Sequence, residues 1–249
     1  MRIETGVCCV DYEDFLRLTL PNNMGRLGCL TVVTSPRDEQ TIRLAQEAGA
    51  DLLVTDAWYR DGPFSKARAL NEWICSVGPV DADRWLLAVD ADIVLPPGLS
   101  LALAHLDTRG LYGARRRTCT SEAAWNEFVD QRRSFESFPI DIPPVKNGRV
   151  WGSRPTSNPA ALCAYFQLWN PMCSVGMKQF PRSPTAADYD VEFALSFPEH
   201  QRSFLSDYEV LHLGPSKANW GGRKSARWQV AVPLRHNGER PWKQGRERA

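Results

Sequence analysis

Two aspartates, Asp90 and Asp92, stand one residue apart where the apolar segment WLLAV (85–89) ends. Side chains alternate along a strand, so two acids at this spacing share one side if the chain stays extended. Carboxylates held close together repel each other and need a counter-charge. Mg²⁺ is typically bound by one or two carboxylates together with water and substrate phosphates. The spacing therefore predicts a metal bridge to a diphosphate, with a pair of solvated loop acids as the alternative.

Strand and helix patterns alternate through the first part of the chain. Apolar and β-branched segments predict strands at 5–10, 29–34, 51–56, 85–89 and 110–114. Helical spacing and capping residues predict helices at 35–49, 63–77 and 96–106. The first of these helices has the clearest termini, with Ser35 as N-cap, Pro36 as first residue and Gly49 as the stop. This order predicts an α/β fold with a mostly parallel sheet and helices on both faces. The two acids then lie at the carboxyl edge, where open α/β sheets bind ligands.

The second part of the chain is less regular. An amphipathic helix is predicted at 120–133, with Trp125, Phe128 and Val129 on one side, and a long loop at 135–160. Further along, a strand is predicted at 161–169, a short helix at 188–197 and a strand at 208–214. We interpret 1–234 as a single domain, with a regular half (1–114) and an irregular half (115–234), followed by a basic tail at 235–249.

Composition is that of an ordinary globular protein, with 249 residues and a formal net charge of +1. No apolar segment approaches the roughly 18 residues of a membrane span, and the N-terminus lacks an apolar signal core. The seven cysteines form no C-x-x-C pair, which is typical of reduced thiols. We therefore expect a soluble, cytoplasmic protein with no membrane partner. Residues 1–109 carry 10 Lys and Arg against 16 Asp and Glu, whereas residues 110–249 carry 20 against 13. This asymmetry suggests an anionic partner for the second half.

Several segments, in order, resemble the GT-A glycosyltransferases of the family 2-like group. They are LTVVTSPRDEQTIRLAQEAGADLLVTD, GPFSKARALNEWI, WLLAVDADIVLPPG, YFQLWN, DYDVEF and HLGPSKANWGGR, and they span about residues 5 to 223. The resemblance implies a GT-A fold in which 1–114 binds the nucleotide sugar and 115–234 the acceptor. It also implies transfer of a sugar from a nucleoside-diphosphate sugar, first of all a UDP-sugar, to an acceptor hydroxyl with inversion. The implied cofactor is Mn²⁺ or Mg²⁺.

The resemblance also assigns roles to individual residues. It makes Asp92 the direct metal ligand, His212 the third protein contact of the metal, and Asp90 a partner of the ribose or of a metal-bound water. Neutral imidazole suits Mn²⁺. The expected donor-binding residues are Thr34, Ser35, Arg37, Asp56, Lys66, Asp90 and Arg223. Lys66 would neutralise a phosphate as a point charge, and Arg223, together with Lys217, lies in a Gly-rich segment that can close over the diphosphate.

The general base of the family lies in an acidic pair that opens a helix. In ADYDVEF the best match is Asp190, with Asp188 and Glu192 as the alternatives. The Glu that usually precedes the base is replaced here by Tyr189. A base at this place takes the proton of the acceptor hydroxyl as its oxygen attacks the anomeric carbon.

The acceptor and the competing classes stay open at this point. A hydroxymethylated base in DNA would suit the basic second half and would have to be flipped out of a duplex. Carbohydrates, small glycosides and protein side chains are the other acceptors. A non-catalytic nucleic-acid-binding protein would use the arginines at 115–117 and 132–133. A nucleotidyltransferase is disfavoured because VDYEDFLRLTLPNN (10–23) lacks glycines. A haloacid-dehalogenase-like phosphatase is disfavoured because its D-x-D lies on the first strand of its domain.

Overall fold

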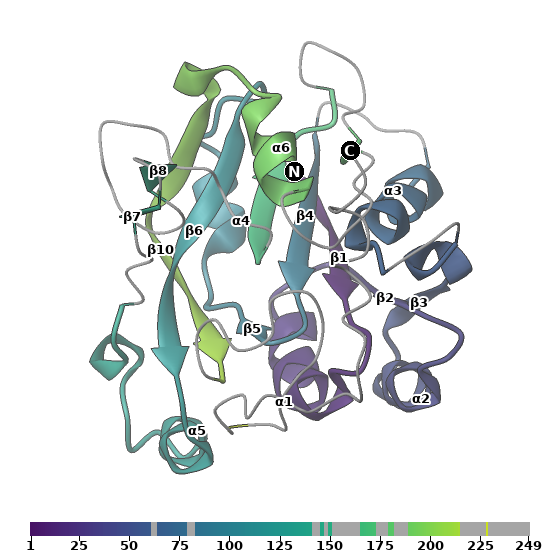
Figure 1. The fold of residues 1–249 in the computed structure, drawn as a ribbon. Helices are drawn as coiled ribbons and strands as arrows, with labels where there is room; N and C mark the ends of the chain where they lie inside the picture. Colours follow the sequence, from purple (N-terminus) through teal and green to yellow (C-terminus); the bar gives the residue numbers. More distant parts are fainter. Residues whose placement is uncertain are drawn as a thin grey trace.

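The main sheet has eight strands in the order β3-β2-β1-β4-β9-β6-β10-β5 (Figure 1). The computed structural model describes residues 1–60, 64–78, 83–140, 165–172, 179–181, 189–214 and 228, and the backbone of 145–146 and 149–150. Every neighbouring pair is parallel except those that involve β9 and β5. The predicted mostly parallel sheet is therefore confirmed, and it continues from the regular half into the irregular half.

The strands of this sheet are β1 (Arg2–Cys8), β2 (Cys29–Thr34), β3 (Asp51–Val54), β4 (Arg84–Asp90), β5 (Ile93–Val94), β6 (Leu111–Cys119), β9 (Phe166–Trp169) and β10 (Arg202–Leu213). A separate hairpin pairs β7 (Val145–Lys146) with β8 (Arg149–Val150). The α-helices are α1 (Glu13–Met24), α2 (Glu39–Ala48), α3 (Lys66–Ser76), α4 (Leu99–Leu103), α5 (Glu122–Val129) and α6 (Tyr189–Leu195). Short 3₁₀ turns are η1 (Asp56–Trp58), η2 (Phe135–Ser137) and η3 (Glu199–Gln201).

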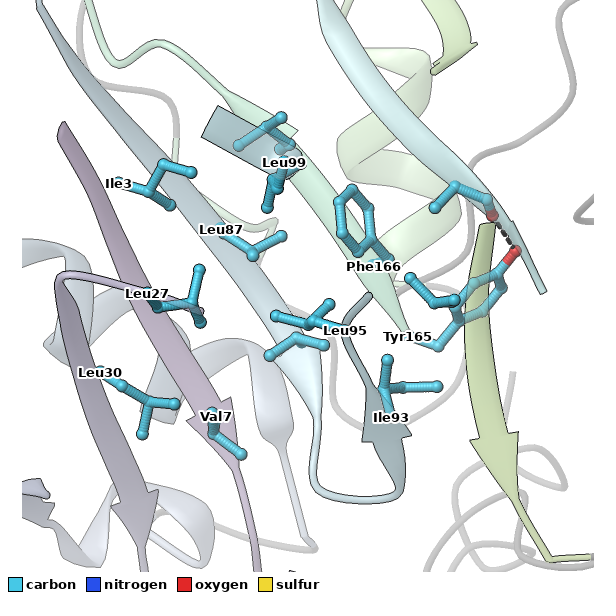
Figure 2. Close-up of a cluster of buried hydrophobic side chains, with 14 of the residues drawn as sticks. Ile3, Val7, Leu27, Leu30, Leu87, Ile93, Leu95, Leu99, Tyr165 and Phe166 are labelled. Atoms are coloured by element: carbon cyan, nitrogen blue, oxygen red, sulfur yellow. Dashed lines mark hydrogen bonds between the residues drawn. The ribbon is translucent and has the colours of Figure 1, made fainter. Parts of the chain in front are cut away.

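Helices cover both faces of the sheet because the buried central strands are apolar on both sides. On β4, Leu87 and Val89 belong to one buried cluster together with residues of α1, α2 and α4. Figure 2 shows part of this cluster, including Leu87, Phe166 and Ile93. Leu86 and Ala88 belong instead to a second cluster with residues of α3 and α6. The predicted two-faced arrangement is therefore confirmed.

Helix α3 packs unusually close to β1. A Cβ added to Gly6 would lie 2.6 Å from the ring of Trp73, so only glycine leaves room for this indole. Trp73 is 1% exposed and Gly6 pairs in the sheet with Ala88 of β4. Lys66, the first residue of the same helix, donates a hydrogen bond to Asp90 at the end of β4.

Several local predictions are wrong in detail. Helix α2 begins at Glu39 rather than at Pro36, because the chain still forms a turn that starts at Ser35. Its N-cap is Asp38, whose side chain accepts a hydrogen bond from the amide of Thr41. Gly49 ends this helix in the left-handed conformation, as predicted. Val129 does not share the buried side of α5, since its side chain is 56% exposed.

Helix α1 was not predicted at all, because its second half carries Pro21 followed by two asparagines. These are poor helix residues in isolation. Tertiary contacts of the helix outweigh that preference, since Leu16 and Leu20 are buried against the sheet. Strands β6 and β10 are longer than predicted, and they pair with each other in parallel from Leu111 to Cys119.

In the part of the chain that the structure describes, no helix is both long and apolar enough to cross a membrane.

Candidate functional site

The polar residues predicted for the site gather at one edge of the sheet. The carboxyl ends of the parallel strands β1, β2, β4, β6 and β10 all lie at this edge. Asp90 is the last residue of β4, and His212 is the next-to-last residue of β10. Thr34 is the last residue of β2. Because parallel strands end together, residues far apart in sequence are brought to one place.

Lys66 and Asp90 form an ion pair at the centre of this edge. The Lys66 Nζ donates to Asp90 Oδ1, and the two side chains are 13% and 34% exposed. Burial is the largest influence on Lys66 and lowers its pKa, but the Asp90 carboxylate together with Tyr189 and Cys8 raises the pKa well above its usual value. For Asp90, burial raises the pKa, the Lys66 charge opposes it, and nearby Asp92 raises it further.

Two buried side chains line the same ion pair from β1 and α6. Burial raises the pKa of the Cys8 thiol to about 12, so this cysteine is an inert apolar neighbour rather than a nucleophile. Tyr189 is 2% exposed, and burial raises its pKa well above the usual value. Among the described residues its hydroxyl has no hydrogen-bond partner. The residue that replaces the usual Glu therefore presents a protonated phenol beside Lys66 and Asp90.

Removing the lysine charge should destabilise the protein. We expect Lys66→Met to lower the free energy of unfolding by about 1–3 kcal/mol, because it leaves the Asp90 carboxylate without its partner. Urea denaturation measures this loss. Since the pKa of Lys66 is raised, the stabilisation is complete below the ordinary lysine pKa of about 10.4 and is lost only as the pH rises through the folded-state value.

A matched control for this variant is Arg109→Met, which breaks an exposed pair with Asp107. The two side chains of that pair are 61% and 46% exposed, so the expected loss is below about 1 kcal/mol. Equal losses for Lys66→Met and Arg109→Met would contradict a special role for the pair at the sheet edge.

Asp92 faces His212 rather than lying beside Asp90 in an extended strand. The chain turns directly after Asp90, so the extended strand on which both acids would share one side does not form. The Asp92 Oδ2 lies 3.5 Å from His212 Nε2, and the side chains are 13% and 12% exposed. Burial raises the pKa of Asp92, but His212, then Arg116 and Lys66, lower it to a net value below the usual range.

One atom of each of these two residues lies buried without a hydrogen-bond partner in the described structure: Asp92 Oδ1 and His212 Nδ1. A carboxylate oxygen and an imidazole nitrogen are suitable ligands for Mn²⁺. Within the described ranges, no group of three or more His, Cys, Asp or Glu side chains forms a complete metal site. The two side chains therefore fit two positions of a coordination shell, in which water and substrate oxygens supply the rest.

A second feature of this edge is a pocket of about 170 Å³ beyond the ends of β2 and β3. Its lining residues are Ser35, Pro36, Arg37, Asp56, Tyr59 and Arg60. The guanidinium of Arg37 lies 4.8 Å above the ring of Tyr59. Asp56, which is 68% exposed, bonds Arg60. Of the predicted donor residues, Ser35, Arg37 and Asp56 thus line one pocket, and buried Thr34 directly precedes them in the sequence.

Tyr59 and Arg60 were missed by the sequence analysis. They follow the third strand directly after the short turn η1, whose Asp56 was the only residue chosen there. The signal that was available is the aromatic and basic pair itself, since an aromatic residue after a strand end offers a stacking surface, and Tyr59 is half-buried there.

Asp190 lies on the first turn of α6, and a buried glutamine of β9 holds this turn. Gln167 donates from Nε2 to the backbone oxygen of Asp190 at 3.0 Å, and Gln167 is 0% exposed. Asp190 is half-buried, whereas Glu192 is exposed. The sequence alternatives at this helix therefore differ in burial. Asp188, together with Arg223 and Lys217, lies outside the described residues, as does the stretch 215–223 of the HLG segment.

The three consecutive arginines of β6 do not form one basic patch. Because side chains alternate along the strand, Arg115 and Arg117 both reach Glu209 of β10, at 3.5 and 2.6 Å. Arg116 lies on the other face, with its guanidinium 4.8 Å above the ring of Tyr165. Two of the three arginines at 115–117 are therefore engaged in ion pairs within the protein, which weakens their interpretation as a nucleic-acid contact.

The sheet order and this edge define the class of fold: the chain has the GT-A-type fold of glycosyltransferases. A mannosyltransferase from Pyrobaculum calidifontis, solved in complex with GDP-Man and Mn²⁺, shares this fold with a TM-score of 0.52 and 16% sequence identity. The match covers 87% of this chain and 58% of the mannosyltransferase, so the chain spans little more than half of that protein's length. A glucosyl-3-phosphoglycerate synthase from Mycobacterium tuberculosis, solved with Mn²⁺, UDP and phosphoglyceric acid, matches with a TM-score of 0.35 and 17% identity, over 47% of this chain and 43% of its own. No protein family and no curated protein matches this chain by sequence.

Proposed function

We propose that this protein is a metal-dependent glycosyltransferase that moves a sugar from a nucleoside-diphosphate sugar to an acceptor hydroxyl. The observation that carries the proposal is the approach of Asp92 to His212, at 3.5 Å, beside the Lys66–Asp90 pair. This pairing lies at the edge of the sheet where α/β folds bind nucleotides. The mannosyltransferase of the same fold was solved with a nucleotide sugar and Mn²⁺.

In this proposal Asp92 and His212 would hold the divalent cation with the carboxylate and the imidazole that approach each other at 3.5 Å. When bound, the cation supplies Lewis-acid stabilisation of the leaving diphosphate. Mn²⁺ or Mg²⁺ fits a site of one carboxylate and one imidazole completed by phosphate oxygens and water. Asp90 is assigned to the ribose or to a metal-bound water rather than to the cation itself, because its carboxylate already accepts a hydrogen bond from Lys66.

The donor nucleotide is assigned to the pocket beyond β2 and β3. Its base and ribose would lie against Arg37 and Tyr59, where a flat guanidinium and an aromatic ring are already stacked. Lys66, which bonds Asp90 at the same sheet edge, supplies a positive charge toward the diphosphate. Arg223 is assigned to the same diphosphate on the sequence resemblance.

Asp190 is assigned as the general base. It takes the proton of the acceptor hydroxyl while that oxygen attacks the anomeric carbon and the diphosphate leaves, which inverts the configuration in a single displacement. Support comes from its half-buried place on α6, whose first turn Gln167 fixes, and from Tyr189 beside it, which faces the Lys66–Asp90 pair. Asp188 is the alternative base.

A hydroxymethylated pyrimidine in DNA stays a predicted acceptor, supported by the basic composition of residues 110–249. The described part of that half weakens this support, since Arg115 and Arg117 are bound to Glu209. Carbohydrates and small glycosides are therefore the acceptors to test beside it.

The experiment is a thermal unfolding series with UDP, GDP, ADP, CDP and dTDP, each with and without Mn²⁺. A ligand at about 100 times its dissociation constant stabilises the folded state by about 2.7 kcal/mol, or roughly 5–10 °C for a chain of this size. We expect one nucleotide to raise the melting temperature by this amount only when Mn²⁺ is present. A protein that no nucleotide stabilises under either condition would contradict the proposal, and DNA binding over a salt series would then be measured.

A further inference from the structure

The loop that carries Asp92 is held from behind by two buried polar side chains of α1. Thr19 Oγ1 donates to the backbone oxygen of Ala91 at 2.7 Å. Asn23 Nδ2 donates to the backbone oxygen of Ile93 at 2.8 Å, and Asn23 Oδ1 accepts from the amide of Leu95 at 2.9 Å. Thr19 and Asn23 are each 1% exposed. Asn22 Nδ2 also donates to the backbone oxygen of Leu95 at 3.0 Å, so four hydrogen bonds tie the helix to Ala91, Ile93 and Leu95.

Asn23 takes the place of a neighbouring strand. Strand β5 is the last in the sheet and pairs with β10 on one side only. The backbone groups of Ile93 and Leu95 that Asn23 bonds are buried, where an unpaired peptide group is costly. An asparagine amide offers one donor side and one acceptor side, as a strand does, whereas Asp offers acceptors only and Leu neither. The helix thus closes the edge of the sheet at this point.

Asp92 itself is held from the opposite side. Its backbone oxygen accepts from the amide of Leu213 at 2.8 Å, and Leu213 directly follows His212. Residues of α1 therefore hold the backbone before and after Asp92, while β10 holds Asp92 beside the histidine. With its backbone fixed on both sides, the carboxylate has little freedom except in its own rotamer, and it faces His212 at 3.5 Å.

We propose that Thr19 and Asn23 are positioning residues that set the affinity of the Asp92–His212 pair for a divalent cation. This inference rests on the proposed function, because it assumes that the pair binds metal. Groups that orient a ligand without touching the metal typically alter metal affinity by about 10- to 100-fold when they are removed. Without the helix contacts, binding of metal must also order the loop, which weakens it.

The test is a titration of the 249-residue chain with Mn²⁺, followed by electron paramagnetic resonance of free Mn²⁺. It is run with Mn²⁺ alone and again with UDP and with GDP. Thr19→Val removes the hydroxyl at nearly constant volume, and we expect the dissociation constant for Mn²⁺ to rise about tenfold. Thr19→Ser, which keeps the hydroxyl, should restore it to within about twofold of the wild-type value.

Thr5→Val is the matched control. Thr5 is 1% exposed on β1, and its hydroxyl has no hydrogen-bond partner among the described residues. This variant makes the same chemical change in the same core without touching the loop. If Thr19 had a merely structural role, each valine variant would bind Mn²⁺ more weakly only in proportion to its own loss of stability. Urea denaturation measures that loss.

A second readout does not depend on metal. Hydrogen exchange of the Leu95 amide should be at least about tenfold faster in Asn23→Leu than in the wild-type protein, since the acceptor of that amide is removed. If Asn23→Leu does not fold, Asn23→Asp replaces it, because the carboxylate keeps the acceptor for Leu95 but loses the donor to Ile93. Faster exchange at the Ile93–Leu95 segment is then the expected result.

The outcomes separate the two proposals. Wild-type protein that binds no Mn²⁺ under any of these conditions overturns the metal site, and the positioning role with it. Wild-type protein that binds Mn²⁺ while Thr19→Val binds it equally well overturns only the positioning role. Weaker binding in Thr19→Val, recovery in Thr19→Ser and no change in Thr5→Val would support it.

Discussion

Asp92→Asn is expected to abolish the Mn²⁺-dependent part of nucleotide binding and to lower sugar transfer by at least about 10²-fold. The amide keeps the size of the side chain but removes the negative charge that faces His212. Since the pKa of Asp92 lies below its usual range, the wild-type carboxylate is fully ionised at neutral pH, and the variant changes its charge by a full unit. The thermal series with and without Mn²⁺ measures the loss of binding directly.

The folded state itself should tolerate this change. The neutral amide relieves the repulsion that Asp92 exerts on Asp90, which compensates for the loss of its contact with His212. Asp107→Asn is the control, because it neutralises an exposed acid that pairs with Arg109 in the connection between α4 and β6. An Asp92→Asn protein whose nucleotide still stabilises it more strongly with Mn²⁺ than without would remove Asp92 from the metal site.

The strand at 85–89 and the acids that follow it could be predicted, because an apolar segment that ends in carboxylates is typical of a central strand in an α/β pattern. The direction of the two carboxylates could not be predicted. Alternation along a strand holds only while the strand continues, and here β4 ends at Asp90 itself. Asp90 consequently bonds Lys66 from α3, whereas Asp92 faces His212 from β10. Where β4 ends depends on its pairing with β1 and β9, which the local sequence does not contain.

For helix α1, the local sequence disfavours a helix that the folded protein nevertheless forms. Pro21 and the asparagines after it oppose a helix in isolation. In the folded protein the asparagine amide is needed to close the edge at β5, and the sheet beneath α1 supplies the burial that stabilises the helix. Polar residues that serve the loop of Asp92 therefore disfavour a helix when the local sequence is considered alone.

The basic stretch at 115–117 shows why charge is hard to interpret from composition. Three arginines in a row look like one positive surface, but on a strand they divide between two faces. Glu209 lies opposite Arg115 in the register of β6 and β10 and pairs with both flanking arginines. Register between distant strands fixes this arrangement, so composition alone overstated the charge that is available to a partner.

Asp190→Asn is expected to leave nucleotide and metal binding intact and to lower the transfer rate by about 10²–10⁴-fold, which is the usual contribution of a general base. The asparagine keeps the size of the side chain and the backbone oxygen that accepts from Gln167, so the first turn of α6 should stay in place. The decisive comparison is between the Mn²⁺-dependent thermal shift, which should equal that of the wild type, and the rate of sugar transfer at saturating donor. Loss of both would point to a binding role instead.

Glu192→Gln is the matched control, because it removes one carboxylate from the same helix at an exposed position. We expect its transfer rate to lie within about twofold of the wild type, since an exposed side chain on this helix is not held against the Lys66–Asp90 pair. An activated acceptor that needs no base, such as one with an already ionised oxygen, should restore transfer by Asp190→Asn but not by Asp92→Asn. If Asp190→Asn transfers sugar at nearly the wild-type rate while Glu192→Gln does not, the base is Glu192, and the helix presents its outer face to the acceptor.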